Sequence, residues 1–402
     1  MSQMNKLVPI LIIGLIVGAG IGWVVYPAMN PVPPPGPDFV QKTVYDALKV
    51  ESDAAKAEVT TTKSALNKAQ TDLATAQSQI TAAQAQIEKL KAPKKIGLVL
   101  ATGGLGDKSF NDGAYAGVTQ AKNELGITFD YVQPKAIAEY EGYQRDFAKS
   151  EQYALIICIG YDQADALAKI AGEYPDQKFV IVDMPVDKPN VASLLFKANE
   201  GSFLIGVVAA KTSITGKVGF VGGIDIPLIR DFFVGFEAGA KWANPQITVL
   251  DPVFVGGWGD PTKGKELAVS LVELGGDAIF AAGGKSGLGA LEGIHEKGVA
   301  GFGVDSCQCY LYPEIKASAT KRVDIAVYEM ILKTVIGKFQ GGVYSKGVAE
   351  GWTGCCRLPE EESFWENMFN FKHSALPSEA LEKLMQAQDK IITGEIKVPS
   401  GF

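Results

Sequence analysis

Most of the residues in this chain that could bind a ligand stand directly after short apolar runs. Such runs read as buried strands of a parallel sheet, and ligands of parallel sheets sit beyond the carboxyl ends of the strands. We therefore expect a ligand cleft lined by the residues at these ends, which are Gly103, Gly104, Gly160, Tyr161, Asp183, Phe196, Gly222, Gly223, Gly283, Gly284 and Asp305.

Residues 107–111 (DKSFN) bring charged, polar and aromatic side chains together in one short stretch. They lie between a predicted strand and a predicted helix, so the polar groups of Asp107 and its neighbours should project into the mouth of the cleft. Phe110 can stack on a planar base, and Asn111 can hydrogen-bond a base edge because an amide both donates and accepts. The alternative is structural, with Phe110 packed in the core and Asn111 capping the helix.

No constellation in the sequence predicts an enzyme, a cofactor or a metal. The chain has two histidines, His295 and His373, in polar segments without metal-ligand spacing, so we expect both at the surface. Residues 259–265 (GDPTKGK) have the spacing of a phosphate-binding loop, but Glu266 replaces the Ser or Thr that would hold magnesium. Asp260 followed by Pro261 instead predicts a helix N-cap. The net charge of −7 argues against nucleic acid as a partner.

The five cysteines predict the redox state of the chain's compartment. Cys158 lies within an apolar run and should be a buried free thiol. The other four form two clusters, and we expect at least one disulfide between them, which implies an oxidising location. A zinc site built from four thiols is disfavoured, because neither cluster has CxxC-like spacing. The clusters are Cys307 with Cys309, and Cys355 with Cys356.

The elements that position these residues alternate between apolar strands and helical patterns from residue 95 onward. Two sets of strands, separated by helical stretches, predict an α/β fold of two doubly wound lobes within residues 93–402. The first set begins at Lys95, Tyr153, Lys178 and Val191, and the second at Lys217, Asp277 and Ala300.

The N-terminal part of the chain has a different character. Residues 7–26 are twenty residues without a charge, which is long enough to cross a bilayer as a helix. We expect an uncleaved anchor within residues 1–30, with everything after it on the extracytoplasmic side of the cell membrane; the alternative is a cleaved signal peptide. Only about six residues precede the span, too few for a cytoplasmic output domain.

A Pro-rich linker at residues 31–37 leads into a predicted stalk at residues 38–92. Large apolar residues recur there every seven positions, with small residues three positions later, which is a coiled-coil pattern. We expect this helix to self-associate; the alternative is a lone amphipathic helix lying along the globular body. The repeating residues are Val59, Leu66, Leu73, Ile80 and Ile87, followed by Ala69, Ala76, Ala83 and Leu90.

Seven ordered motifs resemble the basic membrane protein family, the nucleoside-binding lipoproteins of ABC transporters, and the resemblance covers about residues 95–351. They begin with GGLGDKSFNDGAYAG at residues 103–117 and include GVDSCQ at 303–308; the others are 194–210, 217–241, 259–268, 281–292 and 321–331. The resemblance implies a type I periplasmic-binding fold that closes on a purine nucleoside and delivers it to a membrane permease. It places lobe 1 at about residues 94–215 and 310–345, and lobe 2 at about 216–309 and 346–402.

The resemblance also implies roles for individual residues. Asp183 would accept a hydrogen bond from a base N–H, and Phe196 would form the second wall of an aromatic sandwich with Phe110. Asp305 and Lys321 would bind the ribose hydroxyls. The full predicted binding set is Asp107, Phe110, Asn111, Asp183, Phe196, Trp258, Gly284, Asp305 and Lys321. Asp225 and Arg230 could form an ion pair that shapes the closed cleft.

Several residues depart from the family pattern. Tyr161, Asp162 and Trp258 replace other residues, Lys285 stands where a small neutral residue is common, and Cys307 replaces an acidic one. A different base, a negatively charged ligand, riboflavin or a sugar therefore stay open as ligands. Two other classes stay open as well: a ligand-sensing surface receptor of the same fold, and a structural surface protein whose cleft binds nothing.

Overall fold

The computed structural model describes residues 39–91 and 94–401, which belong to two compact units, Met1–Lys91 and Ala92–Phe402. The predicted membrane span at residues 7–26 and the Pro-rich linker lie outside the described residues. Within the described ranges, no helix is both long and apolar enough to span a membrane.

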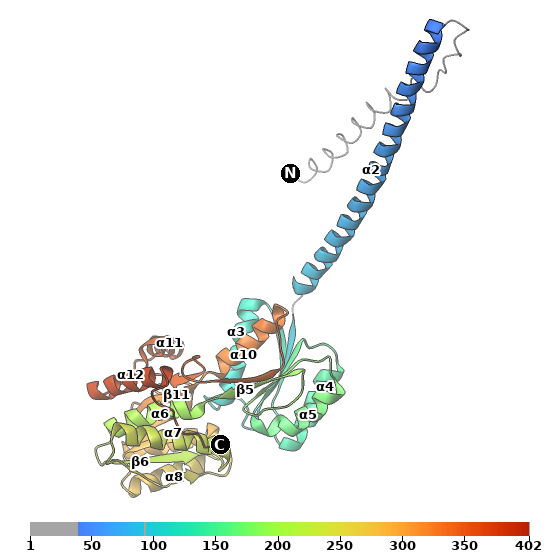
Figure 1. Cartoon of the computed structure of the whole chain (residues 1–402). Coiled ribbons are helices and arrows are strands. Elements are labelled where there is room, and N and C mark those ends of the chain that lie inside the picture. Colours follow the sequence, from blue (N-terminus) through green and yellow to red (C-terminus); the bar gives the residue numbers. More distant parts are fainter. Residues whose placement is uncertain (1–38, 92–93, 402) are drawn as a thin grey trace. The chain divides into compact units, whose positions relative to one another are not determined.

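The described part of the first unit is a single helix, α2 (Phe39–Lys91), of 53 residues (Figure 1). The predicted helix is therefore present over the expected range. Two of its heptad residues, Leu73 and Ile80, are 57% and 56% exposed, although both are large and apolar. Whether they pair with a second copy of the helix stays a prediction.

Lobe 1 of the second unit is built on a parallel sheet with strand order β12-β5-β4-β3-β1-β2. Helices cover both faces of this sheet, α3 with α10 on one side and α4 with α5 on the other, so its central strands are buried and apolar throughout (Figure 1). The strands are β1 (Lys95–Val99), β2 (Thr128–Val132), β3 (Leu155–Ile159), β4 (Phe179–Val182), β5 (Val191–Phe196) and β12 (Gly342–Lys346); the helices are α3 (Phe110–Leu125), α4 (Tyr140–Lys149), α5 (Ala164–Glu173) and α10 (Val323–Val335), with short 3₁₀ turns η2 (Ile137–Glu139) and η3 (Tyr161–Gln163).

Lobe 2 contains the second sheet, with order β13-β11-β10-β9-β6-β7 and β8 paired to β6. Only β13 runs antiparallel to its neighbour among these strands. Helices α6, α7 and α12 pack on one face, and α8, α9 and α11 on the other. The strands are β6 (Lys217–Gly222), β7 (Thr248–Val249), β8 (Val253–Phe254), β9 (Ala278–Ala282), β10 (Ala300–Asp305), β11 (Ile315–Lys321) and β13 (Thr353–Cys355); the helices are α6 (Ala198–Thr212), α7 (Pro227–Ala243), α8 (Pro261–Glu273), α9 (Gly284–Lys297), α11 (Pro359–Phe369) and α12 (Ser378–Ile392).

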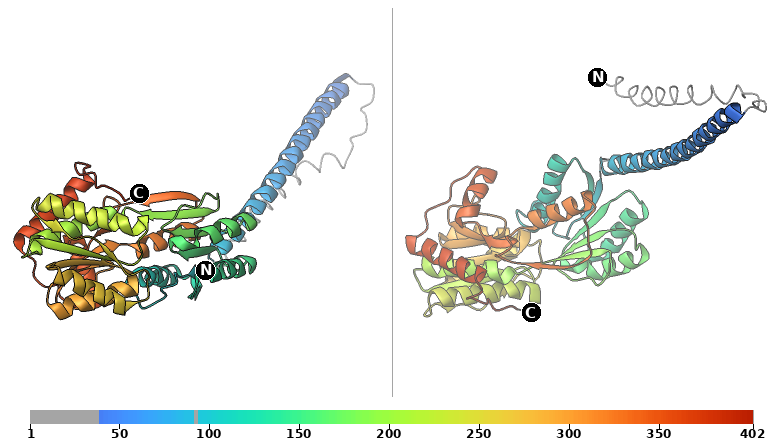
Figure 2. Two further views of the ribbon diagram at one scale, coloured as in Figure 1. Left: turned by 90° about the horizontal axis from the view of Figure 1, so that it is seen from below. Right: turned by 45° about the horizontal axis from the view of Figure 1, so that its top comes forward.

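The lobe boundaries differ from those expected from the sequence. The chain crosses between lobes after β5, after β11 and after β12, so both α6 and β11 belong to lobe 2 rather than lobe 1 (Figures 1 and 2). Glycines explain the place of α6, because they let it approach α7 backbone to backbone. A Cβ added at Gly206 would lie 2.1 Å from the carbonyl oxygen of Phe236, and one at Gly239 would lie 2.0 Å from that of Phe203.

Candidate ligand-binding site

A cavity lies between the two lobes at the carboxyl ends of their strands, as the strand-end residues predict. It encloses about 690 Å³ of empty space, part of which is open to solvent. Every residue of the predicted binding set except Phe196 lines it. Lobe 1 contributes Ala101, Gly103, Asp107, Phe110, Asn111, Gly160, Tyr161, Asp162 and Asp183; lobe 2 contributes Leu228, Ile229, Phe232, Trp258, Ala282, Gly283, Gly284, Lys285, Val304, Asp305 and Lys321.

Two of the lining carboxylates stand on left-handed backbone at strand ends. Asp183 follows β4 with φ +75°, and Asp305 ends β10 with φ +66°. This conformation is costly for a residue with a Cβ and is concentrated at functional sites. The positions of these two side chains are thus maintained against a local backbone preference.

Lys321 forms an ion pair across the two lobes with Asp183. Its Nζ lies 2.5 Å from Asp183 Oδ2, and both side chains are only 4% exposed. The same ammonium lies 4.7 Å from the ring centroid of Phe110 and 5.9 Å from that of Phe232. The other carboxylate oxygen, Asp183 Oδ1, is buried and makes no hydrogen bond within the described part of the chain. A buried acceptor without a donor is costly, so this oxygen is ready to accept a hydrogen bond from a ligand.

Asp305 makes a second connection between the lobes. Its Oδ2 accepts a hydrogen bond of 2.6 Å from the Ser109 hydroxyl. Nearby, the Ser306 hydroxyl donates to the carbonyl oxygen of Lys108 at 2.7 Å. Desolvation raises the pKa of Asp305 to about 6, although the charge of Lys321 opposes this rise.

Asp107 and Asn111 line the cavity, but their polar atoms mainly hold the start of α3. The Asp107 carboxylate accepts bonds from the backbone N–H groups of Ser109, Asn111 and Asp112 and from Asn111 Nδ2, at 2.9–3.2 Å. Asn111 Oδ1 in turn accepts from the N–H of Ala101 at 2.9 Å. Burial raises the pKa of Asp107, and these backbone bonds oppose the rise. Asn111 thus uses its Oδ1 and one Nδ2 hydrogen for structural hydrogen bonds, as the structural alternative predicts.

The aromatic walls of the cavity differ from those expected. Phe110 lines it from lobe 1, but Phe196 lies behind the lining, with its ring centroid 5.0 Å from that of Trp352 and 5.2 Å from Lys321 Nζ. Lobe 2 instead supplies Phe232 and Trp258. Phe232 was not among the residues predicted from the sequence, because it lies within a helix, where aromatic residues usually pack in the core. The one feature of the sequence that pointed to Phe232 was its position in residues 217–241, one of the motifs that resemble the family.

Trp258 reaches the cavity because its neighbours are glycines. A Cβ added at Gly223 would lie 2.3 Å from the Trp258 ring, so no larger residue fits at that position with the ring as placed. Three other departures from the family pattern, Tyr161, Asp162 and Lys285, also line the cavity. Burial raises the pKa of Asp162, and the Tyr140 hydroxyl donates to its Oδ2 at 3.2 Å.

Two sequence motifs are structural. The Asp260 side chain accepts from the N–H of Lys263 at 3.0 Å at the start of α8, which confirms the predicted N-cap. The ion pair between Asp225 and Arg230 is present at 2.6 Å, but both side chains are about half exposed and neither lines the cavity.

The structure places the cysteines and histidines only partly as expected. Cys158 is buried in β3 as expected. All five cysteines are drawn as free thiols, and the bridge between the two clusters stays a prediction. Three of the clustered cysteines, Cys307, Cys309 and Cys356, converge on His373. That histidine is not at the surface, because its side chain is 2% exposed. His295, with its side chain 39% exposed, is at the surface as expected.

Proteins of known sequence and structure share this architecture. An uncharacterized lipoprotein of Pyrococcus horikoshii is 31% identical over 317 residues, which cover 74% of this chain and 78% of that protein. Basic membrane protein A of Borreliella burgdorferi is 34% identical over 321 residues, covering 76% of this chain and 88% of that protein. The crystal structure of an ABC transporter solute-binding protein from Aeropyrum pernix K1 matches with a TM-score of 0.69 at 29% identity, covering 76% of this chain and 94% of that one.

The family assignment agrees with the two-lobed fold and the cleft between the lobes. Residues 94–401 match the Bmp family, described as PnrA-like substrate-binding proteins of ABC transporters. The chain belongs to this family and is a substrate-binding protein of the ABC transporter type.

Proposed function

We propose that this protein captures a nucleoside, with a purine as its base, outside the cell and delivers it to an ABC transporter permease. The observation that carries the proposal is the pairing of aromatic walls with buried carboxylates in one cavity. Phe110, Phe232 and Trp258 offer apolar faces to a planar ring, while Asp183 and Asp305 offer acceptors. A purine nucleoside has the matching parts, a flat base and a ribose that donates hydrogen bonds.

The base would lie beside the aromatic residues, between Phe110 of lobe 1 and the rings of lobe 2. Stacking of this kind contributes about 1–3 kcal/mol per base. The unpartnered Asp183 Oδ1 would accept a hydrogen bond from a ring N–H of the base. Because its other oxygen is already paired with Lys321, the carboxylate is fixed in orientation before a ligand arrives.

The ribose would lie near Asp305, whose carboxylate accepts bonds from hydroxyl groups. Ser109 already donates such a bond, and a ribose hydroxyl would add to it or replace it. A charge-assisted bond of this type contributes roughly 1.5–3 kcal/mol. Closing the lobes around the ligand would bring both ends of it into contact at once, since Asp183 and Asp305 come from different lobes.

The proposal includes the place of the protein in the cell. Residues 7–26 would anchor the chain in the membrane, and α2 would self-associate as a stalk that carries the binding domain. The name of the Pyrococcus relative as a lipoprotein supports a membrane-attached arrangement in general.

Mass spectrometry of small molecules released from the purified chain tests the ligand class. We expect a purine nucleoside at a substantial fraction of one molecule per chain, and its loss from an Asp305→Ala chain purified in parallel. A flavin, or a sugar without a base, released from the wild-type chain but not from the variant would contradict the nucleoside assignment.

A further inference from the structure

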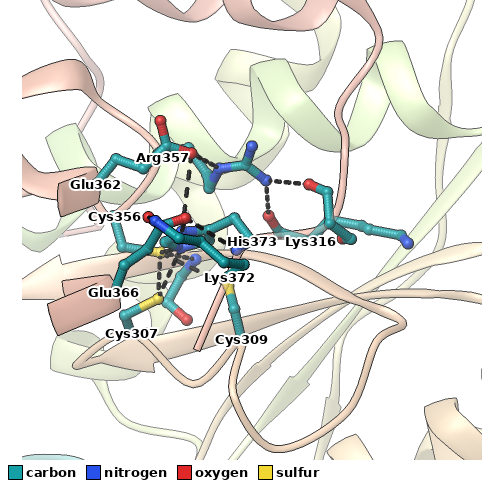
Figure 3. A network of polar contacts seen from close by, with 11 residues as sticks. Cys307, Cys309, Lys316, Cys356, Arg357, Glu362, Glu366, Lys372 and His373 are labelled. Carbon is teal, nitrogen blue, oxygen red and sulfur yellow. Dashed lines mark hydrogen bonds and ion pairs between the residues drawn. The ribbon is translucent and has the colours of Figure 1, made fainter. Parts of the chain in front are cut away.

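A second group of ligating side chains lies in lobe 2, outside the cavity. Cys307, Cys309, Cys356 and His373 each offer one donor atom, and these four atoms all lie within 4.8 Å of one another. Cys309 Sγ is 3.7 Å from Cys356 Sγ, and His373 Nε2 is 3.3 Å from Cys307 Sγ and 3.8 Å from Cys356 Sγ. Figure 3 shows the sulfur atoms and the imidazole facing one another.

These separations fit the coordination shell of one metal ion. With Zn–S near 2.3 Å and Zn–N near 2.0 Å, neighbouring donors of a tetrahedral zinc lie about 3.5–3.8 Å apart. Three of the contacts are close to that spacing. The fourth, between Cys307 Sγ and Cys356 Sγ, is 2.8 Å and would have to open by about 1 Å when a metal enters.

The orientation of His373 is fixed in the way that metal-bound histidines require. Its Nδ1 lies 3.3 Å from Glu366 Oε1, and its backbone N–H donates to the same oxygen at 3.0 Å. A carboxylate on Nδ1 holds the proton there and leaves the Nε2 lone pair facing the sulfurs. On the sulfur side, the backbone N–H of Ser318 donates to Cys356 Sγ at 3.2 Å.

Charge balance also favours a metal. Three thiolates and one Zn²⁺ leave a net charge of −1, and the Arg357 guanidinium follows Cys356 directly in the chain, with a side chain only 5% exposed. Arg357 is held in place by Glu362 at 2.9 Å and by the carbonyl oxygens of Lys316 and Ser374 at 3.0 and 2.9 Å. Figure 3 shows this guanidinium turned toward Glu362 and the carbonyl oxygens, so its charge is shared with Glu362 beside the cluster.

We propose that Cys307, Cys309, Cys356 and His373 bind a single Zn²⁺ in a closed, structural Cys₃His site. A disulfide between two of the cysteines would leave the third thiol and the oriented imidazole without a role, whereas a metal uses all four donors. Local spacing does not predict this site, because Cys307 and Cys309 are separated by one residue and the other ligands follow far along the chain. Binding would release the protons of the three thiols.

The site would join three segments of lobe 2: the loop after β10, the end of β13 and the segment after α11. Cys307 is two residues beyond Asp305, and Gln308 beside it donates from Nε2 to the carbonyl oxygen of Lys108 in lobe 1 at 3.2 Å. A bound metal would therefore stiffen the strand end that presents Asp305 to the cavity. The zinc proposal does not depend on the identity of the cavity's ligand.

Elemental analysis of the full-length chain, purified with zinc in the medium and without chelators, is the direct test. We expect about one zinc per chain, as one four-ligand site requires. Cys309→Ala and His373→Ala should each lose it, while the matched control Cys355→Ala should keep it. Cys355 is adjacent to Cys356 in sequence and is as fully buried as Cys356, but it is not part of the cluster.

Two further measurements keep the proposal testable if an alanine variant fails to fold. Cobalt titrated into the metal-free wild-type chain should give the visible bands of a tetrahedral thiolate site, and Glu366→Gln should weaken metal binding about 10- to 100-fold. The proposal is overturned if the reduced wild-type chain takes up neither zinc nor cobalt. It is also overturned if peptide mapping finds a bridge among these cysteines in the native chain, or if Cys309→Ala and His373→Ala both retain full zinc.

Discussion

Lys321 Nζ of lobe 2 and Asp183 Oδ2 of lobe 1 are 2.5 Å apart, and both residues line the cavity between the lobes. Because both side chains are almost fully buried, Asp183 is the directly paired counter-charge of Lys321, and the charge of Lys321 also acts on Asp305. The pair also fixes which carboxylate oxygen remains free for a ligand. Stability and binding are thus coupled at one contact.

Replacing Asp183 with Asn should destabilise the second unit strongly. The change removes the paired counter-charge of the buried Lys321 ammonium and leaves it only the more weakly coupled carboxylate of Asp305. Breaking a buried ion pair in this way costs about 3–5 kcal/mol. Urea denaturation followed by tryptophan fluorescence measures the loss. Asp225→Asn is the matched control, because it breaks the exposed pair with Arg230 and should change stability little. Equal losses in the two variants would contradict the buried-pair account.

The double variant Asp183→Asn with Lys321→Met tests the same contact in a second way. It removes the unpaired charge as well as its partner, so it should regain much of the stability that Asp183→Asn loses. The check is a double-mutant cycle on the free energies of unfolding, with Lys321→Met as the second single variant. Additive losses would show that the two side chains do not depend on each other.

The raised pKa of Asp305 gives opposite pH trends for stability and for binding. The folded chain holds this proton more tightly than the unfolded chain, so its contribution to stability is present below about pH 4 and is lost as the pH rises through about 6. A ribose hydroxyl needs the ionised carboxylate, so affinity for inosine should fall about tenfold per unit as the pH drops below about 6. Calorimetric titration at a series of pH values checks the second trend, and Asp305→Asn should flatten both. An undiminished pH dependence of affinity in that variant would assign it to another group.

The two phenylalanines near the cavity should respond differently to leucine. Phe232 lines the cavity, so Phe232→Leu removes a stacking face and should weaken inosine and hypoxanthine alike, by roughly fivefold or more. Phe196 packs on Trp352 behind the lining, so Phe196→Leu should lower the melting temperature and leave the affinity nearly unchanged. The reverse result would restore Phe196 as the second aromatic wall.

The exposed apolar residues of α2 predict its self-association. Leu73→Asp with Ile80→Asp should abolish an oligomer formed through the heptad seam, while ligand affinity stays intact. Thr71→Asp with Ser78→Asp adds the same charges on the opposite side of the helix and should leave the oligomer unchanged. Light scattering of the two chains gives the answer. If the chain with Leu73→Asp and Ile80→Asp still forms the oligomer, the heptad residues do not mediate self-association. If that chain loses ligand binding, the helix contacts the binding domain.

The parts of the fold that local pattern determines were predictable from the sequence. Apolar runs predicted β1, β3, β4, β5, β6, β9 and β10, but not the shorter or more polar strands β2, β7, β8, β11, β12 and β13. The rule that ligands bind at strand ends located Asp183, Asp305 and Gly284 at one cavity. Features set by packing at a distance were not predictable. Phe232 lies on α7, which packs closely on α6. This contact between the two helices is also the reason that α6 belongs to lobe 2.

The cysteine cluster shows the same limit. Spacing along the chain favoured a disulfide over a metal, because neither cysteine cluster has CxxC-like spacing and His373 lies far from both Cys307 and Cys309 in the sequence. Only the pairing of β11 with β10 and β13 brings these segments together, and a rule based on local spacing cannot anticipate it.

Calorimetric titration of the full-length chain with inosine, hypoxanthine and ribose tests the central claim most directly. The account predicts that inosine binds tightest, that hypoxanthine binds more weakly through stacking and Asp183, and that ribose alone binds weakest. Asp305→Ala should weaken inosine about ten- to a hundredfold and hypoxanthine little, because the free base lacks the hydroxyls that Asp305 would accept from. Ribose binding as tightly as inosine would contradict the account, since the aromatic walls would then contribute nothing to recognition.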